Sequence, residues 1–410
     1  MRLAFGGKLP PRLGVAVSGG GDSVALLCLA REMCATQGSA LFAVTVDHGL
    51  RAESTDEAQT VATLCEELGV PHEVLRWGMW DGHGNLQNAA REARYELMGD
   101  WAARHDIGTV ALGHTADDQA ETMLMRIARR SGVDGLCGIP ARQSRHGIDW
   151  VRPLLQAKRA NLRTYLTENH ISWVDDPSND DTAFDRIKAR RALTELAGLG
   201  IDAEAFQAVA ENMVRVRKAL ILQTSLAAHD LCHLGGGGVS MCARKLLALP
   251  DEIRRRLLVQ AIGWITGNVY PARRDAVLGL MAALERGTGA TLDGCQVTVH
   301  RGQIWIFREY QAVRHMRCSI VDTWDNRWQF RSAEPVVDKG NLELRALGEE
   351  GLGQCGDWRA VGLPRALLLG TPSVWEGDHL VAAPLANPDN KWRAELDGGE
   401  EAFFATLLSH

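Results

Sequence analysis

The stretch VSGGGDSVAL, residues 17–26, places three consecutive glycines between two apolar patterns. The run before them, LGVAVS (13–18), predicts a buried strand, and residues 22–34 predict a helix. Glycines allow positive φ values and a close approach of the backbone to a ligand, and the free N–H groups at a helix N-terminus attract anions. The stretch therefore predicts a phosphate-binding loop. Its residues are Ser18, Gly19, Gly20, Gly21, Asp22 and Ser23.

The spacing within this loop excludes two common nucleotide-binding motifs. No G-K-[ST] follows the glycines, as a Walker loop requires, and the G-x-G-x-x-G spacing of a dinucleotide fingerprint is absent. Asp22 would repel a phosphate unless a divalent cation lay between them, so we expect Mg²⁺ here with Asp22 as a ligand. A tight glycine turn without a ligand is the structural alternative.

Short apolar runs alternate with amphipathic patterns up to about residue 153. The predicted strands are residues 13–18, 41–47, 72–77 and 109–114, and the predicted helices are residues 22–34, 54–68, 85–105 and 116–130. This alternation indicates right-handed crossovers and a parallel sheet covered on both faces. We therefore expect an α/β domain with a Rossmann-like parallel sheet, and a ligand beyond the carboxyl ends of its strands.

The pattern changes after residue 155. A helix at 156–170 is followed by a polar, turn-rich loop at 173–185 and a long helix at 203–231. The glycines at 235–238 predict a hairpin or a linker that opens a second domain. Residues 295–309 predict a pair of strands around Arg301 and Gly302.

Composition narrows the class of protein. The chain is 46% hydrophobic and 23% charged, as in ordinary globular proteins, and no apolar run has the length of a membrane span or of a signal-peptide core. Its nine cysteines include no C-x-x-C, which argues against a disulfide framework or a zinc ribbon and favours a cytoplasmic protein. The net charge of −6 leaves nucleic-acid binding open, because a polyanion needs only a local positive face.

Four further strings carry polar candidate residues. Three lie at expected strand ends and helix starts, and the fourth, which includes Arg186 and Arg190, forms the polar loop. The four strings are VDHGLR (46–51), GNLQNAAREARY (84–95), LGHTADDQAET (112–122), and DDPSND followed by FDRIKAR (175–190). The candidate residues in them are His48, Arg91, Arg94, His114, Asp117, Asp118, Glu121, Arg186 and Arg190. Asp118 and Glu121 are three positions apart on a predicted helix, so both side chains project from one face, where they suit an ammonium group.

Each string also has a structural reading. The histidines can be turn residues, the arginines can belong to a solvated helix face, and acids at a helix start interact favourably with its dipole. Helix capping alone, however, does not require three clustered acids.

The loop at 18–23 resembles the pyrophosphate loop, or PP-loop, of ATP pyrophosphatases. Those enzymes cleave ATP between its α and β phosphates and activate a substrate oxygen as an adenylate. Together with the four strings, the loop closely resembles the tRNA(Ile)-lysidine synthetase family over nearly all of residues 13–190.

This resemblance implies a PP-loop ATPase domain with two substrates besides ATP. ATP would adenylate O2 of the wobble cytidine in tRNA(Ile) with a CAU anticodon, and the amine of L-lysine would then attack C2. The products would be lysidine, AMP and pyrophosphate, and decoding would change from AUG to AUA.

The resemblance also assigns residues and domains. Residues 18–23 would bind the ATP phosphates, Asp118 and Glu121 would hold the lysine amine, and Arg186 would contact lysine or ATP. The family's R-N-x-x-R string reads RIKAR here, with Ile187 in place of asparagine. The expected division is a catalytic domain at 1–195, a helical linker at 196–238, a tRNA-binding domain at 239–312 and a C-terminal domain at 313–410, the last two being smaller α+β domains.

An enzyme of this kind must also hold the RNA through its phosphates. The candidate strings are RIARRSG (126–132), RVRK (215–218), EIRRR (252–256) and PARR (271–274). Singly, each is more typical of a solvated helix face. Trp324 and Trp328 are candidates for stacking on bases, although core packing is the commoner role of such residues.

Two other functions remain open. A tRNA 2-thiolation enzyme of the same fold is the alternative, but such enzymes need paired cysteines, and Cys137 stands alone after the last helix of the ATP domain. A non-catalytic nucleotide-binding or RNA-binding module is the third reading, against which the carboxylate cluster argues. The oligomeric state is not indicated by the sequence.

Overall fold

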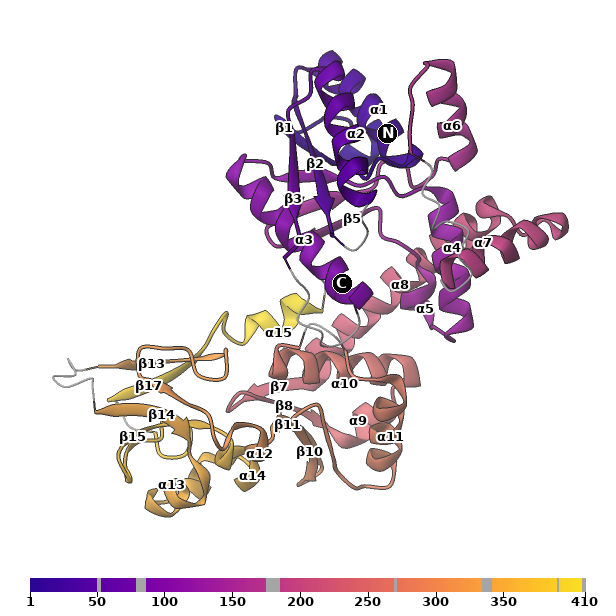
Figure 1. Ribbon diagram of the computed structural model, residues 1–410. Coiled ribbons are helices and arrows are strands. Elements are labelled where there is room, and N and C mark those ends of the chain that lie inside the picture. Colours follow the sequence, from indigo (N-terminus) through magenta and orange to yellow (C-terminus); the bar gives the residue numbers. More distant parts are fainter. Residues whose placement is uncertain are drawn as a thin grey trace. The chain divides into compact units, whose positions relative to one another are not determined.

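The computed structural model describes residues 1–49, 53–78, 86–174, 185–268, 271–333, 341–388 and 391–407. The chain forms two compact units, Met1–Arg217 and Lys218–His410, and most of their helices and strands are labelled in Figure 1. The four-part division expected from the sequence stays a prediction. Within the described ranges, no helix combines the length and the apolar character needed to cross a membrane.

The first unit is built on a six-stranded sheet with the order β3-β2-β1-β4-β6-β5. Its strands are β1 (Arg12–Ala16), β2 (Ala40–Asp47), β3 (His72–Arg76), β4 (Thr109–Ala111), β5 (Arg142–Arg145) and β6 (Ile148–Val151). Neighbouring strands are parallel except for β5, which forms a hairpin with β6. Both turn residues of this hairpin, His146 and Gly147, have positive φ, as a tight β-hairpin requires. The expected α/β fold with a parallel sheet is confirmed, whereas the hairpin was not predicted.

Helices α1 (Gly21–Gln37), α2 (Glu53–Leu68) and α6 (Arg159–Glu168) share a core with one face of this sheet, and α3 (Leu86–Arg104) shares a core with the other face. Of the other helices, α4 (Ala116–Ala128) packs against both α5 (Val133–Leu136) and α7 (Asp185–Leu196). Leu13 and Val15 of β1 point into a core shared with α1, α2 and α6. Gly14, between them, faces α3, and a Cβ at this position would lie 3.0 Å from the Trp101 ring. Packing on both sides therefore fixes the strand from which the glycine loop emerges.

The carboxyl ends of three neighbouring strands bring the predicted motifs to one edge of the sheet. Ala16 at the end of β1 pairs with Val44 of β2, and Val15 pairs with Ala111 at the end of β4. The loops that follow these strands carry residues 18–23, Asp47–His48 and 112–114. Parallel strands present their carboxyl ends on one side, so these loops meet there.

One predicted segment has a different structure from the one expected. Arg186 and Arg190 were assigned to a polar loop, but they lie on α7. Because they are four positions apart on a helix, they share one face. Residues 175–184, which include DDPSND, lie outside the described residues, as do residues 50–51 of VDHGLR and 84–85 of the third string.

The second unit contains an antiparallel sheet with the order β7-β8-β11-β10-β9. The long α8 (Ala203–Leu231) precedes β7 (Cys232–Gly235), β8 (Gly238–Cys242), α9 (Ala243–Leu247), α10 (Asp251–Thr266), α11 (Arg274–Glu285), β9 (Ala290–Leu292), β10 (Cys295–His300) and β11 (Gln303–Arg308). Gly236 and Gly237 both have positive φ and form the turn of the β7–β8 hairpin, so the hairpin reading of the glycine run is confirmed. The strand pair around Arg301 and Gly302 is confirmed as β10 and β11.

The rest of the second unit consists of short strands and helices. They are α12 (Tyr310–Val313), β12 (Arg317–Ser319), β13 (Trp328–Ser332), β14 (Leu342–Ala346), α13 (Gly348–Gln354), α14 (Arg365–Leu369), β15 (Pro372–Glu376), β16 (His379–Ala382), β17 (Trp392–Leu396) and α15 (Glu401–Thr406). Trp324 and Trp328 are 1% and 5% exposed and belong to one apolar core. Their core role is therefore confirmed, and base stacking by these two side chains is excluded by burial.

The basic string at 252–256 is largely occupied by ion pairs within the unit. Arg254 is 4% exposed and donates to Glu285 Oε1 at 2.7 Å. Arg255 and Arg256 both donate to Glu252. The prediction of a phosphate contact is therefore wrong for Arg254, which bridges α10 and α11.

Candidate active site

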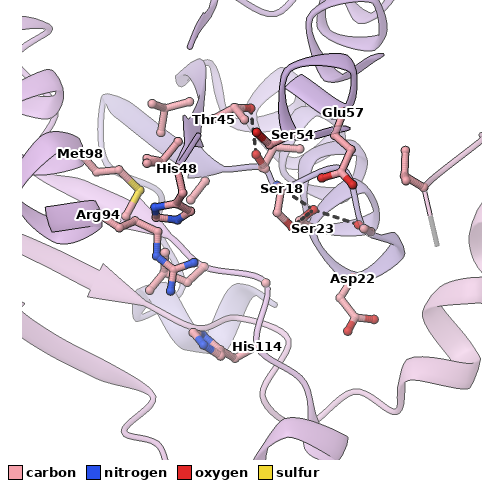
Figure 2. A pocket seen from close by; sticks show the side chains of 18 of the residues that line it. Ser18, Asp22, Ser23, Thr45, His48, Ser54, Glu57, Arg94, Met98 and His114 are labelled. Carbon is pink, nitrogen blue, oxygen red and sulfur yellow. Dashed lines mark hydrogen bonds between the residues drawn. The ribbon is translucent and has the colours of Figure 1, made fainter. Parts of the chain in front are cut away.

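A pocket of about 820 Å³ lies at the edge of the sheet where the motifs meet (Figure 2). Its volume is in the range of small-molecule binding sites. The predicted residues that line it are Ser18, Gly20, Gly21, Asp22, Ser23, His48, Arg91, Arg94, His114, Asp118 and Arg190. Four predicted residues do not line it: Gly19, Asp117, Glu121 and Arg186.

The glycine loop is held in shape by the hydroxyl group of Ser23. Ser23 Oγ accepts from the backbone N–H of Ser18 at 3.1 Å and donates to the carbonyl of Gly20 at 2.9 Å. Gly19 has a φ of +88°, and no side chain caps α1 at Gly20. The start of α1 therefore presents a preformed loop and the positive end of a helix dipole to the pocket, as an anion site requires.

Asp22 lies in the first turn of α1, and one of its two carboxylate oxygens has no hydrogen-bond partner among the described residues. Its Oδ2 accepts from Arg159 Nε at 2.9 Å, while its buried Oδ1 has no hydrogen-bond partner among the described residues. Burial raises the pKa of Asp22, and the nearby Arg159 guanidinium only partly offsets this effect.

This unpartnered oxygen fits a magnesium ion shared with a nucleotide. The described residues contain no group of three or more His, Cys, Asp or Glu side chains that could hold a metal by themselves. Mg²⁺ is commonly held by one or two carboxylates together with substrate phosphates. Asp22, beside the glycine loop, offers a carboxylate oxygen of this kind.

Asp118 combines a structural and an electrostatic position. Thr115 is the N-cap of α4, and Asp118 Oδ2 accepts from the Thr115 backbone N–H at 2.8 Å in a capping box. The other oxygen, Oδ1, accepts from Arg159 Nη2 at 3.2 Å. Burial alone would raise the pKa of Asp118, but Arg159 and the bond from Thr115 hold it below its usual value.

Glu121 lies one turn further along α4 and is 1% exposed. Its Oε1 accepts from Arg190 Nε at 2.9 Å and from Arg159 Nη1 at 3.4 Å. Its Oε2 lies 3.9 Å from Arg186 Nε and accepts no hydrogen bond from the described residues. Glu121 therefore pairs with both Arg186 and Arg190, which lie on the same face of α7 because they are four positions apart.

Asp117 and Ile187 have structural roles. Asp117 Oδ2 accepts from the backbone N–H of Arg159 at 2.7 Å and so anchors the start of α6. Ile187 is 7% exposed, and its apolar side chain can make no hydrogen bond in place of the asparagine expected at this position.

The pocket is also lined by His48, Arg94 and His114 (Figure 2). Burial lowers the pKa of His48 and lowers that of His114 to about 3, so both imidazoles are neutral at pH 7. Burial also lowers the pKa of Arg94, for which no carboxylate partner is found among the described side chains. Arg91, which is exposed, lies over the Tyr95 ring at 5.5 Å. This part of the pocket is therefore suited to negative charge.

The sequence did not point to several residues that line the pocket, among them Arg159, Arg163 and Glu57, or to Asp47 beside it. Arg159 is the first residue of α6, where a positive charge interacts unfavourably with the helix dipole. A basic residue at such a position was the signal in the sequence that could have indicated a role in the site. Asp47 ends β2 and accepts from Ser54 Oγ at 2.6 Å and from the backbone N–H of Gly49 at 2.9 Å. These bonds hold the pKa of Asp47 below its usual value and fix the strand end beside His48.

The chain is similar to a known domain family and to several known proteins. Residues 4–197 match the family model described as PP-loop domain. A protein of Ruegeria pomeroyi named tRNA(Ile)-lysidine synthase is 51% identical over 100% of this chain and 97% of its own length. A protein of the same name from Bradyrhizobium diazoefficiens is 40% identical over 69% of this chain and 81% of its own length.

A solved structure with a partial likeness is that of the U34-tRNA thiolase NcsA from Methanococcus maripaludis. It has a TM-score of 0.45 and 16% identity, and the match covers 51% of this chain and 73% of the thiolase. The full-length match at 51% identity decides the assignment. The chain belongs to the tRNA(Ile)-lysidine synthase family.

Proposed function

We propose that this protein ligates L-lysine to C2 of the wobble cytidine of tRNA(Ile) with a CAU anticodon, at the expense of ATP. The product is lysidine, which pairs with A in place of G, and the by-products are AMP and pyrophosphate. One observation carries the proposal: a single guanidinium, that of Arg159, touches both Asp22 of the phosphate loop and Asp118 of the acidic cluster. An ATP phosphate group and an amine bound at these residues are therefore close neighbours.

The first step joins cytidine O2 to the α-phosphorus of ATP. The new O2–P bond forms while the bond from the α-phosphorus to the bridging oxygen breaks, and pyrophosphate leaves with that electron pair. The start of α1 and the hydroxyl of Ser18 hold the departing phosphates. Asp22 would hold Mg²⁺, which would supply positive charge beside them. Arg94 offers a guanidinium to the negative charge in the pocket.

The second step joins the lysine amine to C2. The N–C2 bond forms, the C2–O2 bond breaks, and AMP leaves with the former O2 oxygen. Asp118 and Glu121 hold the ammonium group, and one of these carboxylates takes the proton that leaves as the ammonium becomes the attacking neutral amine. Arg186 and Arg190 lie beside Glu121, where they suit the carboxylate of lysine.

The relatives' names identify tRNA(Ile) as the nucleic acid, and a cytoplasmic location accords with such a substrate. The remaining basic strings, apart from Arg254, stay candidates for RNA contacts. The thiolation alternative needs an accessible pair of thiols. Cys137 is buried, and its Sγ donates to the carbonyl of Val133 at 3.3 Å, which favours ligation over sulfur transfer.

The test is incubation of the purified protein with ATP, Mg²⁺, labelled lysine and unmodified tRNA(Ile) transcript. Label in the RNA fraction is the expected result. Incorporation of sulfur from a sulfide donor, without lysine, would instead identify a thiolation enzyme. ATP binding without turnover would identify a non-catalytic module.

A further inference from the structure

Arg159 is the one described cation that contacts three carboxylates of the site. Its Nε donates to Asp22 at 2.9 Å, Nη2 to Asp118 at 3.2 Å and Nη1 to Glu121 at 3.4 Å. Its side chain is 20% exposed, and although burial lowers the pKa of Arg159, the three carboxylates outweigh this effect and raise it. The guanidinium is therefore charged and occupies the centre of the cluster.

The backbone of Arg159 is fixed independently of its side chain. Its N–H donates to Asp117 Oδ2 at 2.7 Å, and the preceding carbonyl of Ala157 accepts from the N–H of Ala116 at 3.0 Å. The starts of α4 and α6 are thus joined by two hydrogen bonds that do not involve the guanidinium. Rotation of the Arg159 side chain can therefore change the charge in the cluster while the two helices stay in place.

Two carboxylate oxygens of the cluster are free to accept further hydrogen bonds. Asp22 Oδ1 and Glu121 Oε2 are buried oxygens without a hydrogen-bond partner among the described residues. Buried carboxylate oxygens normally have partners, so two unpartnered ones in one cluster point to ligands that carry donors or positive charge. The free oxygens lie at its two ends, one on the phosphate loop and one on α4.

We propose that Arg159 is a positioning residue that links the binding of ATP to the binding of lysine. Without substrates, its guanidinium stands where the ammonium of lysine would meet Asp118 and Glu121. When ATP and Mg²⁺ engage Asp22, the guanidinium turns from the carboxylates to the phosphates, for which its planar fork of donors is well suited. Asp118 and Glu121 are then released for the ammonium group. This inference rests on the proposed function, which assigns those two carboxylates to lysine.

Linkage makes the idea quantitative. If bound ATP removes a competitor from the lysine site, it raises lysine affinity, and lysine raises ATP affinity by the same factor. Couplings of this kind commonly amount to roughly 5- to 150-fold. Arg159 then favours the binding of ATP before lysine, because in the absence of ATP lysine must itself displace the guanidinium.

The test is calorimetric titration of lysine into the full-length protein, with and without a non-hydrolysable ATP analogue and Mg²⁺. In the wild type we expect the analogue to tighten lysine binding by at least about fivefold. In Arg159→Met, lysine should bind with nearly equal affinity in both conditions, because the competitor is gone. Arg159→Lys, which retains the positive charge, is a second variant in case Arg159→Met does not fold. It should retain part of the coupling between ATP and lysine.

The control is Arg104→Met, which removes an exposed ion pair with Glu73 and should leave the wild-type ratio unchanged. A merely structural role of Arg159 would weaken both affinities without altering their ratio. A wild-type ratio near one, or an undiminished ratio in both Arg159 variants, would overturn the inference while the proposed function stands. Failure of the wild type to bind lysine in either condition would overturn both.

Discussion

Asp118 and Thr115 form a reciprocal pair at the start of α4, with the Thr115 N–H donating to Asp118 Oδ2 at 2.8 Å and Thr115 Oγ1 accepting from the Asp118 N–H at 3.4 Å. The pair leaves Asp118 Oδ1 directed at Arg159. A residue that caps a helix thus has its second oxygen fixed in the pocket. The capping and functional readings of this aspartate are therefore compatible.

We expect Asp118→Asn to separate these two roles. The amide oxygen can still accept from Thr115, but the negative charge opposite the ammonium group is lost. Loss of a hydrogen bond to a charged group costs about 1.5–3 kcal/mol, so kcat/KM for lysine should fall roughly 10- to 150-fold. Steady-state lysine transfer and equilibrium ATP binding measure the two effects, and Thr115→Ser is the control for the cap. Equal loss of ATP affinity would show that Asp118 is misassigned.

Asp22→Ala should weaken pyrophosphate release that depends on Mg²⁺. The substitution removes the carboxylate with the unpartnered buried oxygen, and leaves the glycine loop and Ser23 intact. The expected sign is a higher Mg²⁺ concentration for half-maximal release, read by a pyrophosphate assay at saturating ATP. An unchanged magnesium dependence would remove Asp22 from the metal site.

Gly113→Ala should damage ATP binding through the shape of the phosphate loop. A Cβ at Gly113 would lie 3.1 Å from Ser23 Cα and 3.2 Å from the Ser23 backbone nitrogen, and neither backbone atom can move without displacing the start of α1. Overpacking of this kind typically costs about 1–3 kcal/mol. Calorimetry with an ATP analogue measures the effect. The matched control is Gly108→Ala, whose Cβ would meet nothing within 4 Å, and equal affinities in the two variants would contradict the prediction.

Arg94→Met should stabilise the fold and lower the activity. A half-buried guanidinium with no carboxylate partner among the described residues opposes folding, and methionine fills similar space without charge. We expect the free energy of unfolding to rise by about 0.5–2 kcal/mol while ATP-dependent turnover falls. Urea unfolding and AMP formation report the two effects. A variant that is both less stable and fully active would refute the role of Arg94 in the pocket.

His114 should make the protein less stable in mild acid. Its pKa of about 3 in the folded chain lies below the unfolded value of about 6.5, so the unfolded state binds the proton first as the pH falls. The neutral histidine therefore contributes stability above pH 6.5 that is lost progressively toward pH 3. Asp118 opposes this shift and Arg94, Arg152 and Arg186 favour it, with burial as the main cause.

The substitution His114→Gln removes this dependence. Between pH 6.5 and pH 5 the wild type should lose up to roughly 2 kcal/mol more unfolding free energy than the variant, at 1.36 kcal/mol per pH unit. Denaturant unfolding at the two pH values provides the comparison. Parallel losses in both proteins would show that His114 titrates normally.

The sequence could predict the parts of this molecule that depend on local patterns. The apolar run before Ser18 and the glycines after it are contiguous, and they fix a strand, a loop and a helix together. Asp118 and Glu121 are one helical turn apart, so their common face follows from the period alone. The identity of the sheet edge follows from the parallel topology.

The remaining features depend on contacts between distant segments. Arg159 and Asp22 are 137 positions apart, and no periodicity relates them. The helical placement of Arg186 and Arg190 was missed because a polar composition without strong amphipathic pattern reads as a loop. Burial of Arg254 depends on Glu285 of another helix, which a basic string by itself does not reveal.

The nucleotide products of the reaction give the most direct test of the assigned chemistry. Purified protein incubated with labelled ATP, lysine, Mg²⁺ and tRNA(Ile) transcript is predicted to form AMP and pyrophosphate in equal amounts, one of each for every lysine transferred. Formation of ADP and orthophosphate instead would contradict the account, because it would place cleavage at the γ-phosphate and not at the α-phosphate beside the loop at residues 18–23.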